Sequence, residues 1–435
     1  MNRLMKKETK KEELIGNLGN NMARSSNSRH FHEMDINERL DYLKEYCLDD
    51  NDLKLLAEGI SLENAARLSE NVIAIHGMPL GIATNFKVNG KNYLVPMAIE
   101  ESSVVAAASN GAKYALPEGF TAEWLGNVTV GMIQLKVQEP QAVKRKLMRM
   151  KSDIIEWIND TASSIVKRGG GARDVTFSIV KTARGPFVVV YLYVDTVDAM
   201  GANTINSVCE RLAPRLKETV GGDYILRILS NYAPEKVARA RATFSKDLLG
   251  EDCIERMLDG YALACADIRR ATTHNKGIMN GIDAVAIATG NDWRALEAGA
   301  HAYAARNGRY APLTHYEKDT KGNLIGTIEI PIQIGIVGGI TSVHPTTKIA
   351  LKILGVTKAQ ELACVMASVG LAQNFAALRA LAVEGIQRGH MELHAVNLAM
   401  AAGAEGKKAD EIAKRMVAEG RISLEYAKRL LEEYR

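Results

Sequence analysis

The order of strand-like and helix-like segments between residues 127 and 230 constrains the fold of this chain more than any other feature. Residues 127–137 alternate apolar and polar side chains as a strand does, and residues 141–167 carry a long amphipathic helical pattern. The segments that follow are, in chain order, strands at 174–180 and 187–194, a helix over about 203–218 and a strand at 224–230. The succession β-α-β-β-α-β is the split βαβ, or ferredoxin-like, arrangement. We therefore predict a small nested domain at 126–228.

After this nested domain the chain becomes rich in alanine, glycine and good helix formers, which favours a large, mainly helical domain that resumes there. We predict that this large domain is built from residues 31–125 and 229–384. Residues 1–30 are predicted to be a polar N-terminal extension. Residues 385–435, with glycines at 403 and 420 between short helical patterns, are predicted to form a small helical C-terminal flap, or lid. The predicted fold class is α+β.

Local signals place several element boundaries. Asp35, Asp50 and Ser61 each precede a helical pattern, and side-chain oxygens of these types cap the free N–H groups of a first turn. Asn89-Gly90, between two apolar-alternating runs, predicts a β-hairpin.

Composition excludes several classes of protein. The formal net charge is only +4, whereas nucleic-acid-binding surfaces show concentrated basic blocks, so we expect no nucleic-acid partner. The five cysteines form no CxxC pair, which favours a reducing compartment over a disulfide framework. We find neither 18 successive apolar residues nor the apolar core of a signal peptide, and we therefore expect a cytoplasmic protein with no membrane contact.

Two adjacent carboxylates, Glu100 and Glu101, precede a run of small residues in the segment at 95–109. An acidic first helical turn, favoured by the helix dipole, is one interpretation. The functional interpretation is a general acid or base held at the rigid start of a helix.

Lys276 lies among glycine, histidine and asparagine residues in the segment at 269–292. Small and amide residues allow a ligand to approach a lysine closely, and such a lysine can stabilise developing negative charge. Asp292 would neutralise and orient Lys276. The alternative is a turn lysine paired with a capping aspartate.

Gly201 and Asn203 follow the strand that ends near residue 194 and precede a helix. Backbone N–H groups at a helix N-terminus bind phosphate, so this turn is a candidate dinucleotide site. No GxGxxG follows a strand, which argues against a Rossmann domain. Glycines 335, 338 and 339 indicate another place where backbone comes close to a neighbour.

His390 and His394 are four residues apart and would share a helix face, which raises the possibility of zinc. Glu392 would point away from that face, and a third ligand is not evident. We therefore predict no metal and interpret His390 as a single acid-base histidine on a mobile lid.

Together these segments resemble the class II hydroxymethylglutaryl-coenzyme A (HMG-CoA) reductases, the soluble bacterial and archaeal type, from about residue 35 to the C-terminus. The runs that carry the resemblance are SENVI, MAIEESSVVAAAS, DAMGANTIN, HNKGIMNG, TGNDWRA and GIQRGHMELHA, in that order. The family's cofactor domain is also a nested ferredoxin-like domain.

The resemblance implies roles for particular residues. The catalytic set it implies is Glu101, Lys276, Asp292 and His390. The substrate-binding set is Ser103, Arg270, Thr273 and Asn280, and the dinucleotide-binding set is Asp198, Met200, Gly201, Asn203 and Asn231. The resemblance also implies a homo-oligomer with its active site at a dimer interface, and HMG-CoA, mevalonate and coenzyme A as substrate and products.

The family's reaction is an NAD(P)H-dependent four-electron reduction that passes through a hemithioacetal and mevaldehyde, in the mevalonate pathway of isoprenoid biosynthesis. Lys276 would stabilise the oxyanion, Glu101 would supply a proton to the aldehyde oxygen, and His390 would protonate the departing coenzyme A thiolate. The alternative is the same enzyme working in the oxidative, mevalonate-degrading direction with NAD. NADH-preferring relatives place an aspartate where this chain has Ala162; with Lys167-Arg168 nearby, this favours NADPH over NADH.

A remote alternative from another class is an RNA-binding ferredoxin-like protein, because Phe187, Tyr191 and Tyr193 share one strand face. An RNA-binding face would be open to solvent. We expect this face to pack on the domain's own helices instead.

Overall fold

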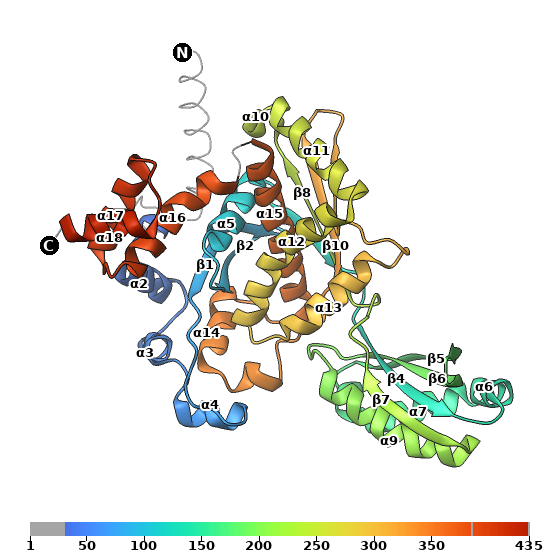
Figure 1. Cartoon of the computed structure of the whole chain (residues 1–435). Helices are drawn as coiled ribbons and strands as arrows, with labels where there is room; N and C mark the ends of the chain where they lie inside the picture. Colours follow the sequence, from blue (N-terminus) through green and yellow to red (C-terminus); the bar gives the residue numbers. More distant parts are fainter. Residues whose placement is uncertain (1–30, 384–385, 434–435) are drawn as a thin grey trace.

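A computed structural model describes residues 31–383 and 386–433, with the side chains of 386–393 left undescribed. The predicted α+β class is confirmed. Figure 1 shows the nested domain set apart from the rest of the chain, joined to it through β4 and β7, and the C-terminal helices on the opposite side, beside α2.

The large domain is organised around a six-stranded sheet that the sequence patterns outside the hairpin did not predict. The strands lie in the order β2-β1-β3-β8-β10-β9. Their bounds are β1 Leu80–Val88, β2 Lys91–Ala98, β3 Phe120–Trp124, β8 Val237–Phe244, β9 Thr314–Lys318 and β10 Leu324–Pro331. The Asn89-Gly90 hairpin is confirmed, since β1 and β2 pair antiparallel on either side of it. The description "mainly helical" was therefore incomplete.

Helices cover this sheet. They are α5 Val104–Tyr114, α10 Lys246–Leu249, α11 Glu251–Ala266, α12 Ile268–Ala288, α13 Trp293–Ala304, α14 Pro345–Leu354 and α15 Ala359–Val383, with a short 3₁₀ helix at Gly339–Ser342. Among the described residues, only α15 is long and apolar enough to cross a membrane, and 89% of its most apolar window is buried. Phe375 of α15 stacks on Phe244 with ring centroids 3.8 Å apart, so α15 is a core helix of this domain.

The nested domain has the predicted β-α-β-β-α-β order. Its strands are β4 Val128–Lys136, β5 Gly171–Thr182, β6 Gly185–Asp195 and β7 Asp223–Leu229, in the sheet order β5-β6-β4-β7 with antiparallel neighbours. The helix predicted over 141–167 is three helices, α6 Pro140–Arg149, α7 Lys151–Thr161 and α8 Ser163–Val166, and the second crossover is α9 Ala202–Val220. The boundaries of the domain itself remain a prediction.

One expectation about the nested sheet was wrong. Val188, Val190 and Leu192 of β6 belong to the core under the helices. Because side chains alternate along a strand, Phe187, Tyr191 and Tyr193 lie on the opposite face, away from the domain's own helices.

Local capping explains the N-terminal helices, which follow a 3₁₀ turn at Phe31–Glu33 and are α2 Ile36–Tyr46, α3 Asp50–Glu58 and α4 Leu62–Leu68. Asp35 caps α2 and Ser61 caps α4, as predicted. The cap of α3 is Asp49, not Asp50: its side chain accepts from the backbone N–H of Asp52, whose side chain accepts in return from that of Asp49. A reciprocal capping box satisfies two free donors, which Asp50 in the first turn cannot do.

The C-terminal helices α16 Ile386–Ala401, α17 Lys407–Ala418 and α18 Leu424–Glu433 have a small core of their own, which includes Ala395, Ile412 and Leu430. Gly403 and Gly420, both with positive φ, lie in the turns between these helices, as predicted. A separate core is what a lid needs in order to move as a unit.

Candidate active site

Glu101 and Lys276 are far apart in sequence but form an ion pair. Lys276 Nζ lies 2.9 Å from Glu101 Oε2. Lys276 is in the middle of α12, and Glu101 is in the turn before α5, where Ser103 has a left-handed φ of 72°. The alternative interpretation of Lys276 as a turn residue was therefore wrong. Both side chains remain about half exposed, at 58% for Lys276 and 43% for Glu101, so other groups can reach them.

Hydrogen bonds to neighbouring segments fix the turn of α12 that carries Lys276. His274 Nε2 lies 2.6 Å from Thr314 Oγ1, and burial lowers the pKa of His274 to about 3, which keeps the ring neutral. Asn275 donates to the carbonyl of Ala311 and accepts from the N–H of Leu313. Asn374 of α15 donates to the carbonyl of His274. These bonds fix the position and rotation of the helix beneath the ion pair.

Predicted substrate-binding residues lie around Lys276 on the same helix. Thr273 and Asn280 are three and four residues from Lys276, the spacing that places side chains on one face of a helix. Arg270, one turn earlier, is half-buried, and that burial lowers its pKa. The fourth residue of the set, Ser103, is the N-cap residue of α5, two residues after Glu101. The predicted acyl-binding residues therefore gather near the ion pair.

A cavity of about 250 Å³ lies where the nested domain meets the large domain. We call it the three-loop cavity, because it is lined by residues of three segments. These are 199–204, which leads into α9, 290–292, which follows α12, and 335–341. Met200, Gly201 and Asn203 of the predicted dinucleotide set are all on its wall. The predicted close approach at Gly335 is confirmed, because a Cβ there would lie 2.4 Å from the backbone nitrogen of Met200.

Two residues of the dinucleotide set lie elsewhere. Asp198 accepts from the N–H of Ala359 at the start of α15, 2.8 Å away, and so ties the nested domain to that helix. The backbone carbonyl of Asn231 accepts from Gln333. Neither residue lines the three-loop cavity.

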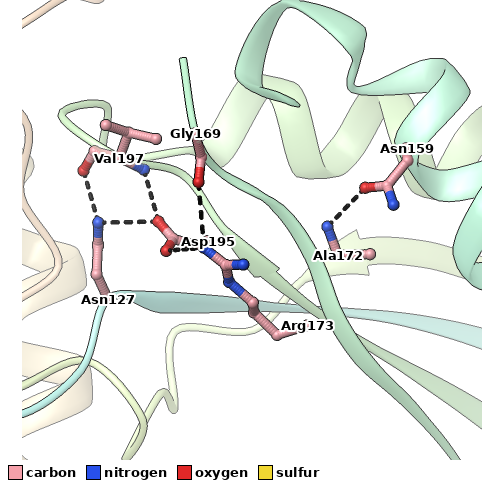
Figure 2. Close-up of polar contacts among 7 residues, drawn as sticks. All are labelled: Asn127, Asn159, Gly169, Ala172, Arg173, Asp195 and Val197. Carbon is pink, nitrogen blue, oxygen red and sulfur yellow. Dashed lines mark hydrogen bonds and ion pairs between the residues drawn. The ribbon is translucent and has the colours of Figure 1, made fainter. Parts of the chain in front are cut away.

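Asp198 instead lines a second cavity of about 380 Å³, together with Arg168, Asp195 and Lys358. Figure 2 shows how its wall is held: Asp195 accepts from Asn127, from Arg173 and from the N–H of Val197. These bonds fix the end of β6 and the loop that leads to Asp198. Arg168 and Lys358 contribute two positive charges to this second cavity.

Asp292 lies on the wall of the three-loop cavity, not beside Lys276. Its side chain caps α13 by accepting from the N–H groups of Arg294 and Ala295, and it pairs with the Arg294 guanidinium at 3.1 Å. Its side chain is 37% exposed, not buried. At 1.5 Å per residue, about 18 Å of helix separate Lys276 from Ala288 at the end of α12.

The side chain of His390 lies outside the described residues, although α16 includes its position. His394, whose side chain is described, is exposed. Among the residues the structure describes, no three His, Cys, Asp or Glu side chains are grouped as a metal site would require.

Sequence reasoning missed the 335–341 loop as a cavity wall, and it missed Asn291, whose Oδ1 accepts from the N–H of Gly335 at 2.8 Å. The glycines were a usable signal for the loop. Nothing in the sequence paired the loop with residues 199–204.

A family model described as hydroxymethylglutaryl-coenzyme A reductase matches residues 35–395. The chain belongs to this family. An HMG-CoA reductase of Archaeoglobus fulgidus is 53% identical over 418 residues, which cover 95% of this chain and 96% of the relative. A probable HMG-CoA reductase of Borreliella burgdorferi is 40% identical over 75% of this chain and 76% of the relative.

Solved structures of the Streptococcus pneumoniae HMG-CoA reductase match with 40% identity. One has a TM-score of 0.79 and covers 93% of this chain and 99% of its own. Another, described as a class II HMG-CoA reductase bound to NADPH in open conformations, has a TM-score of 0.78, covering 92% of this chain and 100% of its own. The chain is therefore a class II HMG-CoA reductase family member and an oxidoreductase. Its ferredoxin-like domain belongs to a reductase family, which removes the basis for the RNA-binding alternative.

Proposed function

We propose that this chain reduces HMG-CoA to mevalonate and coenzyme A with a nicotinamide cofactor. The observation that carries the proposal is the 2.9 Å contact between Glu101 and Lys276, two residues that the family resemblance assigns to one reaction centre. Family membership supports the reaction class.

The three-loop cavity suits a nicotinamide cofactor. Gly335 lets the 335–341 loop pack directly against the backbone of Met200, which fixes the two walls relative to each other, and Gly201 opens α9, where backbone N–H groups and the helix dipole favour an anionic phosphate. We assign Met200, Gly201 and Asn203 to its walls, and Asp198 and Asn231 to the support of those walls. When bound, the cofactor supplies hydride.

The chain's own residues manage charge and protons around the thioester carbon. Lys276 Nζ donates to the carbonyl oxygen as that oxygen gains negative charge, both at the thioester and at the aldehyde stage. Glu101 delivers a proton to the aldehyde oxygen from its carboxylic-acid form, for which the half-exposed carboxylate first takes up a proton from solvent. His390 protonates the leaving thiolate, whose conjugate thiol has a pKa of about 8.5. Ser103, Arg270, Thr273 and Asn280 hold the acyl group.

We propose that two protomers complete each site. Within one chain, the ion pair lies at the middle of α12, whereas the three-loop cavity lies beyond the C-terminal end of that helix. The Asp292 side chain caps the N-terminus of α13. The side chains of Lys276 and Asp292 cannot span that separation. A second copy that brings its cavity to the first copy's ion pair would place Asp292, as a catalytic residue, beside Lys276.

Subunit complementation tests this arrangement. Lys276→Ala and Asp292→Ala homo-oligomers, each inactive, are mixed under conditions that exchange subunits. If the site is shared between protomers, each heterodimer contains one intact site of its two. Because random exchange makes about half of the dimers heterodimers, activity recovers to about one quarter of the wild-type value. If both residues act within one chain, the mixture stays inactive, and the shared site is refuted.

We further propose NADPH as the preferred cofactor and the reductive, mevalonate-forming direction. Ala162 stands where NADH-preferring relatives place an aspartate, and it packs in the nested core with 1% exposure, so no carboxylate is available at this position to hold a ribose hydroxyl. Arg168 on the second cavity and the NADPH-bound relative also support NADPH. Arg168→Gln should lower kcat/KM for NADPH and leave that for NADH unchanged, and an equal loss with both cofactors would contradict the assignment.

A cytoplasmic location also remains a proposal. The five cysteines are free thiols, which suits a reducing compartment. Assays with mevalonate, coenzyme A and NAD or NADP would test the reverse, mevalonate-degrading direction.

A further inference from the structure

Lys236 is a buried lysine that no step of the proposed reaction uses. Its side chain is fully inaccessible to solvent, and within the described part of the chain its ammonium forms no ion pair with a carboxylate. It immediately precedes β8 in the large domain, where its backbone carbonyl accepts from the N–H of Ile332. Burying an ammonium group among neutral atoms is unfavourable, so packing alone does not account for it.

The ammonium reaches from the large domain into the nested domain, where four oxygens lie within hydrogen-bonding distance of its three N–H donors. It lies 3.2 Å from the carbonyl of Met200 and 3.5 Å from that of Ala199. The hydroxyls of Thr196 and Thr129 lie at 3.3 and 3.4 Å. The same hydroxyls donate to the same carbonyls, Thr196 to Ala199 and Thr129 to Met200. The successive carbonyls of Ala199 and Met200 are thus both directed towards Lys236, and each also accepts a hydrogen bond from a threonine hydroxyl.

The orientation of these carbonyls determines where the following N–H groups point. In a trans peptide the C=O and N–H bonds point in opposite directions. With the carbonyls of Ala199 and Met200 directed at Lys236, the N–H groups of Met200 and Gly201 point away from it, and both of these residues line the three-loop cavity. Those are donors for an anionic or carbonyl group of a bound cofactor.

We propose that Lys236 is a positioning residue for the nicotinamide cofactor, which fixes the loop 199–201 so that its N–H groups face the cavity between the two domains. This inference rests on the proposed function, because it takes the three-loop cavity as the cofactor site. Burial lowers the pKa of Lys236 to about 7, against the opposing effect of the Asp195 carboxylate.

The test is to measure NADPH binding to the full-length protein by titration, without any thioester. Lys236→Met keeps the length and apolar stem of the side chain and removes the ammonium. We expect its Kd for NADPH to rise about tenfold or more, because the hydrogen bonds from the Lys236 amino group that orient the loop are lost. The KM for HMG-CoA should be unchanged, and kcat at saturating NADPH should fall much less than the Kd rises. Lys217→Met, on the exposed end of α9 in the same domain, is the control and should bind NADPH as the wild type does.

A folded Lys236→Met protein that binds NADPH within twofold of the wild type would overturn the proposal, as would equal increases in the KM values for NADPH and HMG-CoA. If Lys236→Met does not fold, NADPH binding to Thr129→Val is the test, because this substitution removes only one donor to the Met200 carbonyl. Its Kd should rise about two- to tenfold, and no rise would be contrary to the proposal. A wild-type protein that binds NADPH but does not reduce HMG-CoA would refute the proposed function but not the positioning role of Lys236.

Discussion

Replacing Lys276 by methionine should separate catalysis from stability. The substitution keeps the length of the side chain and removes the charge that contacts Glu101 at 2.9 Å. Both partners are about half exposed, and an exposed ion pair contributes about 0–1 kcal/mol to the free energy of unfolding. We therefore expect the melting temperature to fall by about 4 °C at most.

The expected loss of activity is much larger. A single donor to a developing oxyanion contributes about 2.7–4 kcal/mol, or about 10²–10³ in kcat. The rate is measured from the decrease in NADPH absorbance at saturating HMG-CoA, with thermal unfolding followed in parallel. Two molecules of NADPH should be oxidised for each thioester by the wild-type protein.

Lys217→Met is the matched control for this experiment. Lys217 pairs with Asp223 at 3.1 Å, with exposures of 49% and 64%, but it lies on the nested domain away from the ion pair. It should lose as little stability as Lys276→Met and keep full activity. A Lys276→Met protein that keeps more than a tenth of the wild-type rate, or that loses activity only because it unfolds, would refute the catalytic role of Lys276.

Three further predictions follow from individual contacts. Gly335→Ala should raise the KM for NADPH at least about tenfold, because the new Cβ would lie 2.4 Å from the nitrogen of Met200; an unchanged KM would show that the loop can move aside at no cost. Asp49→Ala should lower the free energy of unfolding by about 1 kcal/mol through loss of the α3 cap, whereas Asp50→Ala should have a smaller effect, and the reverse order in a denaturant titration would refute the reassigned cap. Lys236→Met should be more stable than the wild type at pH 6, because the unfolded chain binds the lysine proton up to pH 10.5 while the folded chain releases it near pH 7. That advantage should shrink as the pH rises from 7 towards 10.5, and a pH-independent difference in melting temperature would contradict it.

The sequence was sufficient for features that depend on neighbouring residues. The β-α-β-β-α-β order of the nested domain, the hairpin at Asn89-Gly90 and the caps at Asp35 and Ser61 follow from periodicity and from turn or capping chemistry within a few residues. These features need no knowledge of which distant segments pack together. The pairing of Glu101 with Lys276, which are 175 residues apart, was instead implied by the family resemblance, and the structure brings the two side chains into contact.

Tertiary structure decided the features that depend on distant partners. Periodicity shows that one face of an element is buried but not what covers it, so the central sheet that joins β3, β8 and β10 was not predicted, and Phe187 was placed on the wrong face. Asp292 was expected to neutralise and orient Lys276, yet the length of α12 carries it to the three-loop cavity. No sequence signal distinguishes Lys236 from the other lysines of the chain. It becomes distinctive only because two domains enclose its ammonium and place two loop carbonyls and two threonine hydroxyls within hydrogen-bonding distance.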